Sequence, residues 1–266
     1  MSNFLSKEDK ILSKEFIEKG YIIRKISDYE SLEFIQKKIV SYSEKDINQK
    51  NTKNNITWLN EIHNHLDIKN LNDFRLNIIN SINHEKDFRE NYFNIAKKYL
   101  EVIVGNEVSM QLRVNLSIQL PGDTSSLLPV HADTWSGDSP YEVVVWVPLV
   151  NCFKTKTMFI LNPEKNKMLN DDFRNLAGQN SENLYKSIER DVEFLNVKFG
   201  EILIFNQSLP HGNRINNEKE TRWSMNCRFK GIFTPYSDKK IGEFFEPVTL
   251  RAASKIGMNY KAPILK

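Results

Sequence analysis

The run VSMQLRVNLSIQL, from Val108 to Leu120, marks the point at which the chain becomes rich in β-forming residues. Turn signals such as Pro121-Gly122-Asp123 separate it from further runs of the same kind at 141–150, 155–161, 201–205 and 221–233. Many short antiparallel strands are commonly closed as a double-sheet jelly roll. We therefore predict a double-stranded β-helix core over residues 107–266, with a helical insertion at about 165–190.

Residues 1–106 carry apolar residues at helical spacing instead. The polar, Asn- and Lys-rich stretch 41–55 is expected to be a loop, and a short strand is expected at 21–23 after Gly20. Helices are expected at 9–19, 29–43, 71–82 and 88–104. The prediction is an α+β protein whose N-terminal helical region packs outside the jelly roll.

Composition argues against several classes of function. The 266 residues carry a net charge of only +3, with Lys, Glu and Asp interleaved, so no nucleic-acid footprint is indicated. No apolar run approaches the length that spans a bilayer, and the first residues lack a secretion signal, so we expect a cytoplasmic protein without a membrane partner. Cys152 and Cys227 are isolated and are expected to be reduced. Formation of a homo-oligomer is left open.

Two of the five histidines lie in the β-rich part: His131 in PVHAD (129–133) and His211 in LPHGN (209–213). Residues two apart in an extended segment project to the same side, so His131 and Asp133 can bind one ion. A distant histidine would complete the two-His, one-carboxylate set of non-haem Fe(II) oxygenases, which leaves positions open for reactants. Taken alone, an HxD tripeptide is more often a loop histidine beside a turn-capping carboxylate.

The other histidine pair is a poor metal candidate. His63 and His65 would diverge by about 200° if 58–66 were helical, so they could not share an ion without a break in the helix.

The spacing around His211 favours a metal site over a chance occurrence of the HxD tripeptide. Arg222 follows His211 by eleven residues and begins the run RWS, so Arg222 and Ser224 face the same side of an expected strand. This set resembles the 2-oxoglutarate-dependent oxygenases, in which an HxD pair precedes a distal His and an Arg that pairs with the co-substrate. The resemblance implies Fe(II) at His131, Asp133 and His211, with 2-oxoglutarate and O2 as co-substrates and Arg222 and Ser224 on the 2-oxoglutarate carboxylate. Its matching elements cover 111–229, less than half of the chain.

A finer resemblance rests on the stretches HADTWSGDSPYEVVVWVPLV (131–150) and LPHGNRINNEKETRWSMNCRFK (209–230). These are similar to the phytanoyl-CoA-hydroxylase-like branch, which includes ectoine hydroxylase. They are closest to the small bacterial oxygenases of sporadic carbohydrate-biosynthesis clusters and streptomycin biosynthesis. The chain departs from the branch because it lacks a Pro-Gly-Ser-His turn after Asn151. Thr157 or Lys156 could contact the co-substrate in its place, or both could belong to a polar edge strand.

Further residues are candidates for the pocket. Alternation would put Gln111, Arg113 and Asn115 on one strand face, where we assign Asn115 to the co-substrate and the other two to the substrate. Trp135 is a candidate for the site mouth. Asn226 and Arg228 share the face of Arg222 but could be structural.

The resemblance implies an enzyme that hydroxylates, or otherwise oxidises, a small polar molecule such as a sugar or sugar conjugate. A fatty acyl substrate would leave the polar groups of the expected pocket face without hydrogen-bond partners, at a cost in binding free energy. The alternative is a cupin-like sugar isomerase or a non-catalytic carbohydrate-binding jelly roll, neither of which needs an arginine eleven residues after a histidine.

Overall fold

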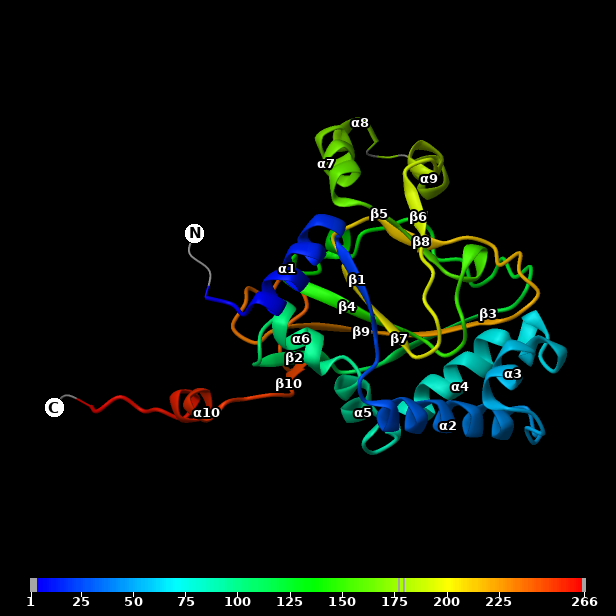
Figure 1. Ribbon diagram of the computed structural model, residues 1–266, viewed down its shortest axis with the longest axis horizontal. Helices are drawn as coiled ribbons and strands as arrows, with labels where there is room; N and C mark the ends of the chain where they lie inside the picture. Colours follow the sequence, from blue (N-terminus) through cyan, green and yellow to red (C-terminus); the bar gives the residue numbers. More distant parts are fainter. Residues whose placement is uncertain (1–3, 177, 179, 265–266) are drawn as a thin grey trace.

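Two antiparallel β-sheets form the centre of the protein, whose computed structural model describes residues 4–176, 178 and 180–264 (Figure 1). The larger sheet has the order β1-β7-β4-β9-β2-β10, with β3 also paired to β9, and the smaller has the order β6-β5-β8. The larger sheet consists of β1 (Tyr21–Lys25), β2 (Val108–Gln111), β3 (Asn115–Gln119), β4 (Glu142–Pro148), β7 (Glu201–Asn206), β9 (Arg222–Gly231) and β10 (Phe245–Pro247). The smaller consists of β5 (Met158–Leu161), β6 (Val192–Phe194) and β8 (His211–Asn213). The predicted α+β class with antiparallel sheets is confirmed.

Strand β9 is the longest strand of the larger sheet and organises it. It pairs with β4 along one side, and with β3 and then β2 along the other. Its residues alternate between two environments. Trp223 and Phe229 face the N-terminal helices, where their rings meet Phe74 at 5.9 Å and Tyr92 at 6.5 Å between centroids. The polar residues Arg222, Ser224, Asn226 and Arg228 lie on the opposite face, between the two sheets.

The N-terminal helices cover the outer face of the larger sheet (Figure 1). They are α1 (Lys7–Lys19), α2 (Tyr29–Asp46), α3 (Asn55–Asn60), α4 (Leu71–His84), α5 (Phe88–Asn94) and α6 (Lys97–Ile103), with 3-10 turns η1 (Ile62–Asn64) and η2 (Ile68–Asn70). This region also contributes β1, which forms the edge of the sheet beside β7. The expected loop at 41–55 is wrong at both ends. Helix α2 continues because Ser43 is buried, and α3 begins where Asn54 accepts a hydrogen bond from the Thr57 N–H.

The single strand expected over 108–120 is also wrong, because β2 and β3 are separated at 112–114. The side chain of Asn83, from α4, accepts a hydrogen bond from the Val114 N–H at 2.8 Å and donates one to the Val114 carbonyl at 2.9 Å. These two bonds replace the ladder bonds that Val114 would make in a continuous strand. The expected common face of Gln111, Arg113 and Asn115 therefore does not form.

Three helices lie between β5 and β6, in the region of the expected insertion: α7 (Pro163–Asp171), α8 (Phe173–Leu176) and α9 (Ser181–Ile188). Asn162 and Asn180 cap α7 and α9 by accepting hydrogen bonds from backbone N–H groups. Leu169 and Ile188 pack against Phe159 of β5 in a small separate apolar cluster. The insertion thus stands over the smaller sheet (Figure 1).

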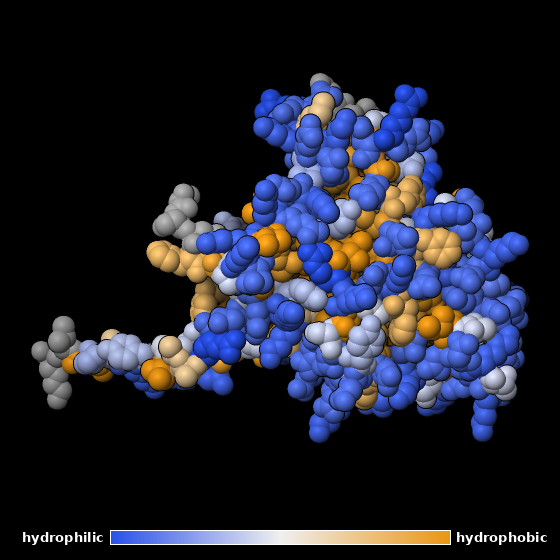
Figure 2. All heavy atoms as spheres, in the orientation of Figure 1, coloured by the Kyte–Doolittle hydropathy of each residue, from blue (hydrophilic) through white to orange (hydrophobic). Residues whose placement is uncertain are grey.

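The C-terminal segment extends away from the body and contains α10 (Ala252–Met258) (Figure 1). Ile256 and Met258 are exposed on it, and Figure 2 shows hydrophobic residues at the surface of this segment. Two short 3-10 turns, η3 (Asp133–Ser136) and η4 (Lys154–Lys156), complete the elements. Among the described residues, no helix is both long and apolar enough to cross a membrane.

Candidate active site

His131 and His211 are brought together by backbone pairing. The segment before η3 lies against β8, where His131 N–H donates to the His211 carbonyl at 3.0 Å and His211 N–H donates to the His131 carbonyl at 2.8 Å. Their ring centroids are 4.3 Å apart. Directly opposed residues of an antiparallel pair project to the same face, so this pairing sets the distance between the imidazoles.

Asp133 completes the group from the first residue of η3. Its backbone N–H donates to the Gln207 carbonyl at 3.0 Å, which fixes the start of the turn. One carboxylate oxygen, Oδ1, lies 3.5 Å from His131 Nε2. A ligand atom from each of His131, Asp133 and His211 lies within 4.8 Å of the others, so one metal ion could contact all three.

The same imidazole nitrogen is available on both histidines. His131 Nδ1 lies 2.8 Å from the Pro129 carbonyl, and His211 Nδ1 lies 2.8 Å from the Leu209 carbonyl. Because a carbonyl can only accept, each Nδ1 carries the proton and each Nε2 keeps a free lone pair. A backbone acceptor behind a ligating histidine is the usual way in which ring orientation and tautomer are fixed at a metal site.

The protonation states of Asp133 and His211 suit a cation. Burial lowers the pKa of His211 to about 4, which keeps this imidazole neutral. Burial acts to raise the pKa of Asp133, but its contacts with His131 and Arg228 outweigh burial and lower that pKa. Burial also acts to lower the pKa of His131, but the contact with Asp133 reverses the shift. The chain therefore presents two imidazoles and one carboxylate, a donor set that fits the facial triad of non-haem Fe(II).

The three side chains line a common cavity. The larger sheet contributes the polar face of β9, together with Ser117 of β3 and the apolar side chains Val144, Trp146 and Phe205. The registers Ser117↔Ser224 and Asn115↔Asn226 put polar residues opposite each other across β3 and β9. The polar inner face of the larger sheet thus meets the histidine cluster across the cavity.

Arg222 is a buried positive charge, with 3% of its surface exposed. Its guanidinium donates to Ser117 Oγ at 2.8 Å and to the Thr157 carbonyl at 3.4 Å, but no carboxylate of the described residues forms an ion pair with it. Arg222 Nε, Ser224 Oγ and Thr157 Oγ1 are buried without a hydrogen-bond partner in the part of the chain that the structure describes. Burial lowers the pKa of Arg222 to about 10, so it remains a cation at neutral pH. A buried, unpaired charge is costly, which indicates that this end of the cavity accommodates an anion.

Comparison with solved structures shows the same architecture in non-haem enzymes. A nickel complex of the non-heme monooxygenase ThoJ superposes with a TM-score of 0.56 at 14% identity, covering 90% of this chain and 84% of that one. The alpha ketoglutarate dependent carbocyclase SnoK from nogalamycin biosynthesis gives 0.55 at 13% identity, covering 92% and 97%. HygX from Streptomyces hygroscopicus, with nickel and 2-oxoglutarate bound, gives 0.51 at 11% identity, covering 87% and 89%. The chain shares the fold of these three solved structures. No protein-family model matches the sequence, and no curated protein does.

The other sequence candidates lie in different places. Gln111 is buried and accepts a hydrogen bond from the Arg228 N–H at 3.2 Å, so it supports β9 from outside the cavity lining. Arg113 is exposed in the break between β2 and β3, contrary to the expected pocket face. Asn115 does not line the cavity. Its side-chain amide donates to Asn226 Oδ1 at 3.1 Å, and Asn226 is a lining residue.

Three further candidates are not among the residues that line the cavity. Thr157 is fully buried and contacts Arg222 through its carbonyl. Lys156 is directed elsewhere, since its ammonium donates to Asn60 and Glu220 at 2.7 Å each. Trp135 is 37% exposed, and its ring lies 5.1 Å from that of Phe173 in α8.

The two remaining sequence histidines of interest are engaged away from the site. His63 Nδ1 lies 3.0 Å from Thr221 Oγ1, and His65 stacks on Trp58 at 5.3 Å.

Sequence reasoning missed Ser117, Gln207 and Asp138. Ser117 had a signal, because it follows Asn115 by two residues and therefore shares its strand face. Gln207 lies near Asp133 through the packing of distant segments, whereas Asp138 is close to it along the chain, where its N–H donates to the Asp133 carbonyl at 3.4 Å.

Proposed function

We propose that this chain is an Fe(II)- and 2-oxoglutarate-dependent oxygenase. The observation that carries the proposal is the unpaired, buried guanidinium of Arg222 in the same cavity as the His131, Asp133 and His211 group. A metal site alone is compatible with many functions. A metal site that shares its cavity with a buried cation without a counter-ion calls for an anionic ligand held beside the metal, and 2-oxoglutarate is a dianion with a chelating end.

Each part of the site then has one role. His131 Nε2, His211 Nε2 and one oxygen of Asp133 would hold the iron. Arg222 would pair with the far carboxylate of 2-oxoglutarate, and the Ser224 hydroxyl, which lacks a partner, would donate a second hydrogen bond to it. Thr157 Oγ1 is a third unpartnered group in this region. The anion would therefore satisfy groups that the folded chain leaves unpaired.

When bound, iron would supply oxygen activation coupled to decarboxylation of 2-oxoglutarate to succinate and CO2, with oxidation of a substrate C–H bond. The protein orients the reactants and limits access of water. Val144, Trp146 and Phe205 form apolar walls beside the polar groups of the cavity.

For the substrate, we propose a small polar molecule, namely a sugar or sugar conjugate, in line with the resemblance to carbohydrate-cluster oxygenases of the phytanoyl-CoA-hydroxylase-like branch. Asn226 of β9 is a polar, half-buried group of the lining that could bind a hydroxyl. Action in the cytoplasm, on a small molecule rather than on nucleic acid, is part of the same proposal. The cupin-like isomerase or binding module is disfavoured, because neither gives Arg222 a counter-ion.

Anaerobic addition of Fe(II) and 2-oxoglutarate tests the reaction class. A weak visible metal-to-ligand charge-transfer band is expected for the wild-type protein. His131→Ala, Asp133→Ala and His211→Ala should each lose the band and bound iron while remaining folded, because the three ligands converge from two segments on an open site. His63→Ala, which alters a histidine outside the cavity, should retain both. A folded wild-type protein without the band, or a His211→Ala variant with full iron content, would contradict the proposal.

A succinate-release assay tests the substrate class. Nucleotide sugars, sugar phosphates, aminocyclitols, amino acids and acyl-CoA esters would be compared at equal concentration. Stimulation by sugars or their conjugates is expected, whereas stimulation by acyl-CoA alone would overturn the substrate proposal and leave the iron site intact.

A further inference from the structure

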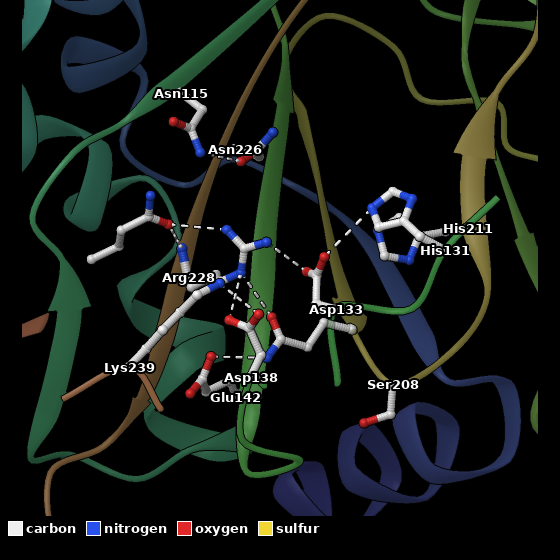
Figure 3. A network of polar contacts seen from close by, with 12 residues as sticks. Asn115, His131, Asp133, Asp138, Glu142, Ser208, His211, Asn226, Arg228 and Lys239 are labelled. Atoms are coloured by element: carbon white, nitrogen blue, oxygen red, sulfur yellow. Dashed lines mark hydrogen bonds and ion pairs between the residues drawn. The ribbon is translucent and has the colours of Figure 1, made fainter. Parts of the chain in front are cut away.

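One oxygen of the Asp133 carboxylate forms an ion pair with another side chain of the protein (Figure 3). Its Oδ1 atom lies on the side of His131, at 3.5 Å from Nε2. Its Oδ2 atom is 2.8 Å from NH2 of Arg228, whose side chain reaches across from β9. The two oxygens of this carboxylate therefore have different surroundings, one toward the imidazoles and one toward a guanidinium.

Arg228 is itself held on several sides. Its Nε donates to Gln207 Oε1 at 3.0 Å and lies 3.3 Å from Asp138 Oδ1, while its NH1 lies 3.4 Å from Gln111 Oε1. Gln207 is fixed in turn, because its amide donates to Glu142 Oε2 at 2.8 Å. The planar fork of the guanidinium is thus engaged along both edges, which fixes the direction in which NH2 points.

The charges alternate along this network. Asp138 is almost fully buried and binds both Arg228 and Lys239, the latter at 2.5 Å between Nζ and Oδ2. An arginine next to a metal-ligand carboxylate would oppose cation binding by its own charge. Asp138 offsets that charge, so the arginine can orient Asp133 without making the site repel a cation.

We propose that Arg228 is a positioning residue that restricts Asp133 to metal ligation through Oδ1 alone. The inference rests on the proposed function, since it concerns the metal held by His131, Asp133 and His211. Ligation by two imidazoles and one carboxylate oxygen leaves three of six octahedral positions open, which 2-oxoglutarate and O2 together require. A carboxylate free to bind through both oxygens would occupy one of those positions.

Cobalt(II) binding without oxygen or substrate provides the test. Arg228→Met keeps most of the side-chain volume but releases Asp133 Oδ2. We expect Co(II) affinity to fall about 10- to 100-fold, the usual cost of losing a group that orients a metal ligand. The visible Co(II) absorption spectrum should also change, because it reports coordination number and geometry. If Arg228 had no positioning role, removal of its positive charge would instead raise Co(II) affinity.

Two further variants separate positioning from general damage. Arg228→Lys keeps the charge, but one ammonium cannot contact Asp133, Asp138 and Gln207 together, so Co(II) binding weaker than wild type is expected. This variant also serves if Arg228→Met does not fold. Arg89→Met removes a part-buried arginine that binds Glu246 and the Gln111 carbonyl, and it should leave Co(II) affinity and spectrum unchanged.

The outcomes distinguish this inference from the proposed function. A wild-type protein that does not bind Co(II) at this site would overturn both. Wild-type binding with unchanged affinity and spectrum in both Arg228 variants would overturn only the role of Arg228.

Discussion

The guanidinium of Arg222 has one hydroxyl and one carbonyl as partners and no counter-ion among the described residues. Arg222→Leu removes a charge-assisted contact to the far carboxylate of 2-oxoglutarate, so binding of the co-substrate should weaken by roughly 2–4 kcal/mol. Calorimetric titration of the Co(II)-loaded protein with 2-oxoglutarate would measure this loss, and Co(II) affinity itself should change little. Arg89→Leu is the matched control, and an equal loss there would show that Arg222 is not the specific anchor.

Acid should destabilise the metal-free protein through His211. Burial lowers the pKa of His211 to about 4 from an ordinary value of 6.5. Between these values the unfolded chain binds a proton that the folded chain does not, so stability falls as pH falls through this window. About 2 kcal/mol should be lost from pH 7 to pH 5, measured by urea unfolding with chelator present.

The neighbouring groups His131 and Asp133 do not cause the same loss of stability between pH 7 and pH 5. The pKa of His131 is raised, so the stability that it contributes is lost only as the pH rises above 6.5. The pKa of Asp133 is lowered, so the stability that it contributes is lost only as the pH falls below 3.8. His211→Gln should therefore show a clearly shallower decline from pH 7 to pH 5, and an identical decline would be evidence against His211 as its source.

At the scale of the element, Gly212 lets β8 approach the segment that carries His131. A Cβ atom at Gly212 would lie 2.7 Å from the Leu128 carbonyl oxygen and 3.1 Å from that of Pro129. Gly212→Ala must push these two backbone segments apart, which should cost about 1–3 kcal/mol in unfolding free energy and weaken Co(II) binding by separating the imidazoles. Chemical unfolding and Co(II) titration would measure the two effects.

Gly257→Ala is the control for this prediction, because a Cβ there meets nothing within 4 Å. It should leave both quantities unchanged. If Gly212→Ala behaved in the same way, the close approach of the two segments would not be needed for the metal site.

At the scale of the molecule, the two ends of the chain contribute unequally. Ile22 of β1 is fully buried and β1 pairs with all five facing residues of β7, so deletion of 1–25 should prevent soluble folding by exposing β7 as a sheet edge. Truncation after Leu250 removes α10 and no residue that is buried among those described, and it should change the unfolding free energy by no more than about 0.5 kcal/mol. Expression, circular dichroism and urea unfolding would compare both truncations. A large loss of stability in the C-terminal truncation would contradict this account.

The sequence by itself determined the fold class, the mainly helical N-terminal region and the strand at Tyr21, because hydrophobic period and turn residues are local signals. It also selected Arg222 and the HxD pair, since spacing along extended chain fixes which side chains share a face. Alternation along β9 placed Asn226 and Arg228 on the cavity face with Arg222, as the structure has them.

Only the tertiary structure decided how far these local patterns extend and what surrounds the metal ligands. Asn83, thirty-one residues from Val114, interrupts the expected strand by binding its backbone, and this removes Arg113 from the pocket. The partners of Arg228 likewise come from distant parts of the chain, since Asp133 and Asp138 precede β4 whereas Gln207 follows β7. Hydrogen bonds between distant segments depend on chain packing in three dimensions, whereas periodicity reports only the environment of neighbouring residues.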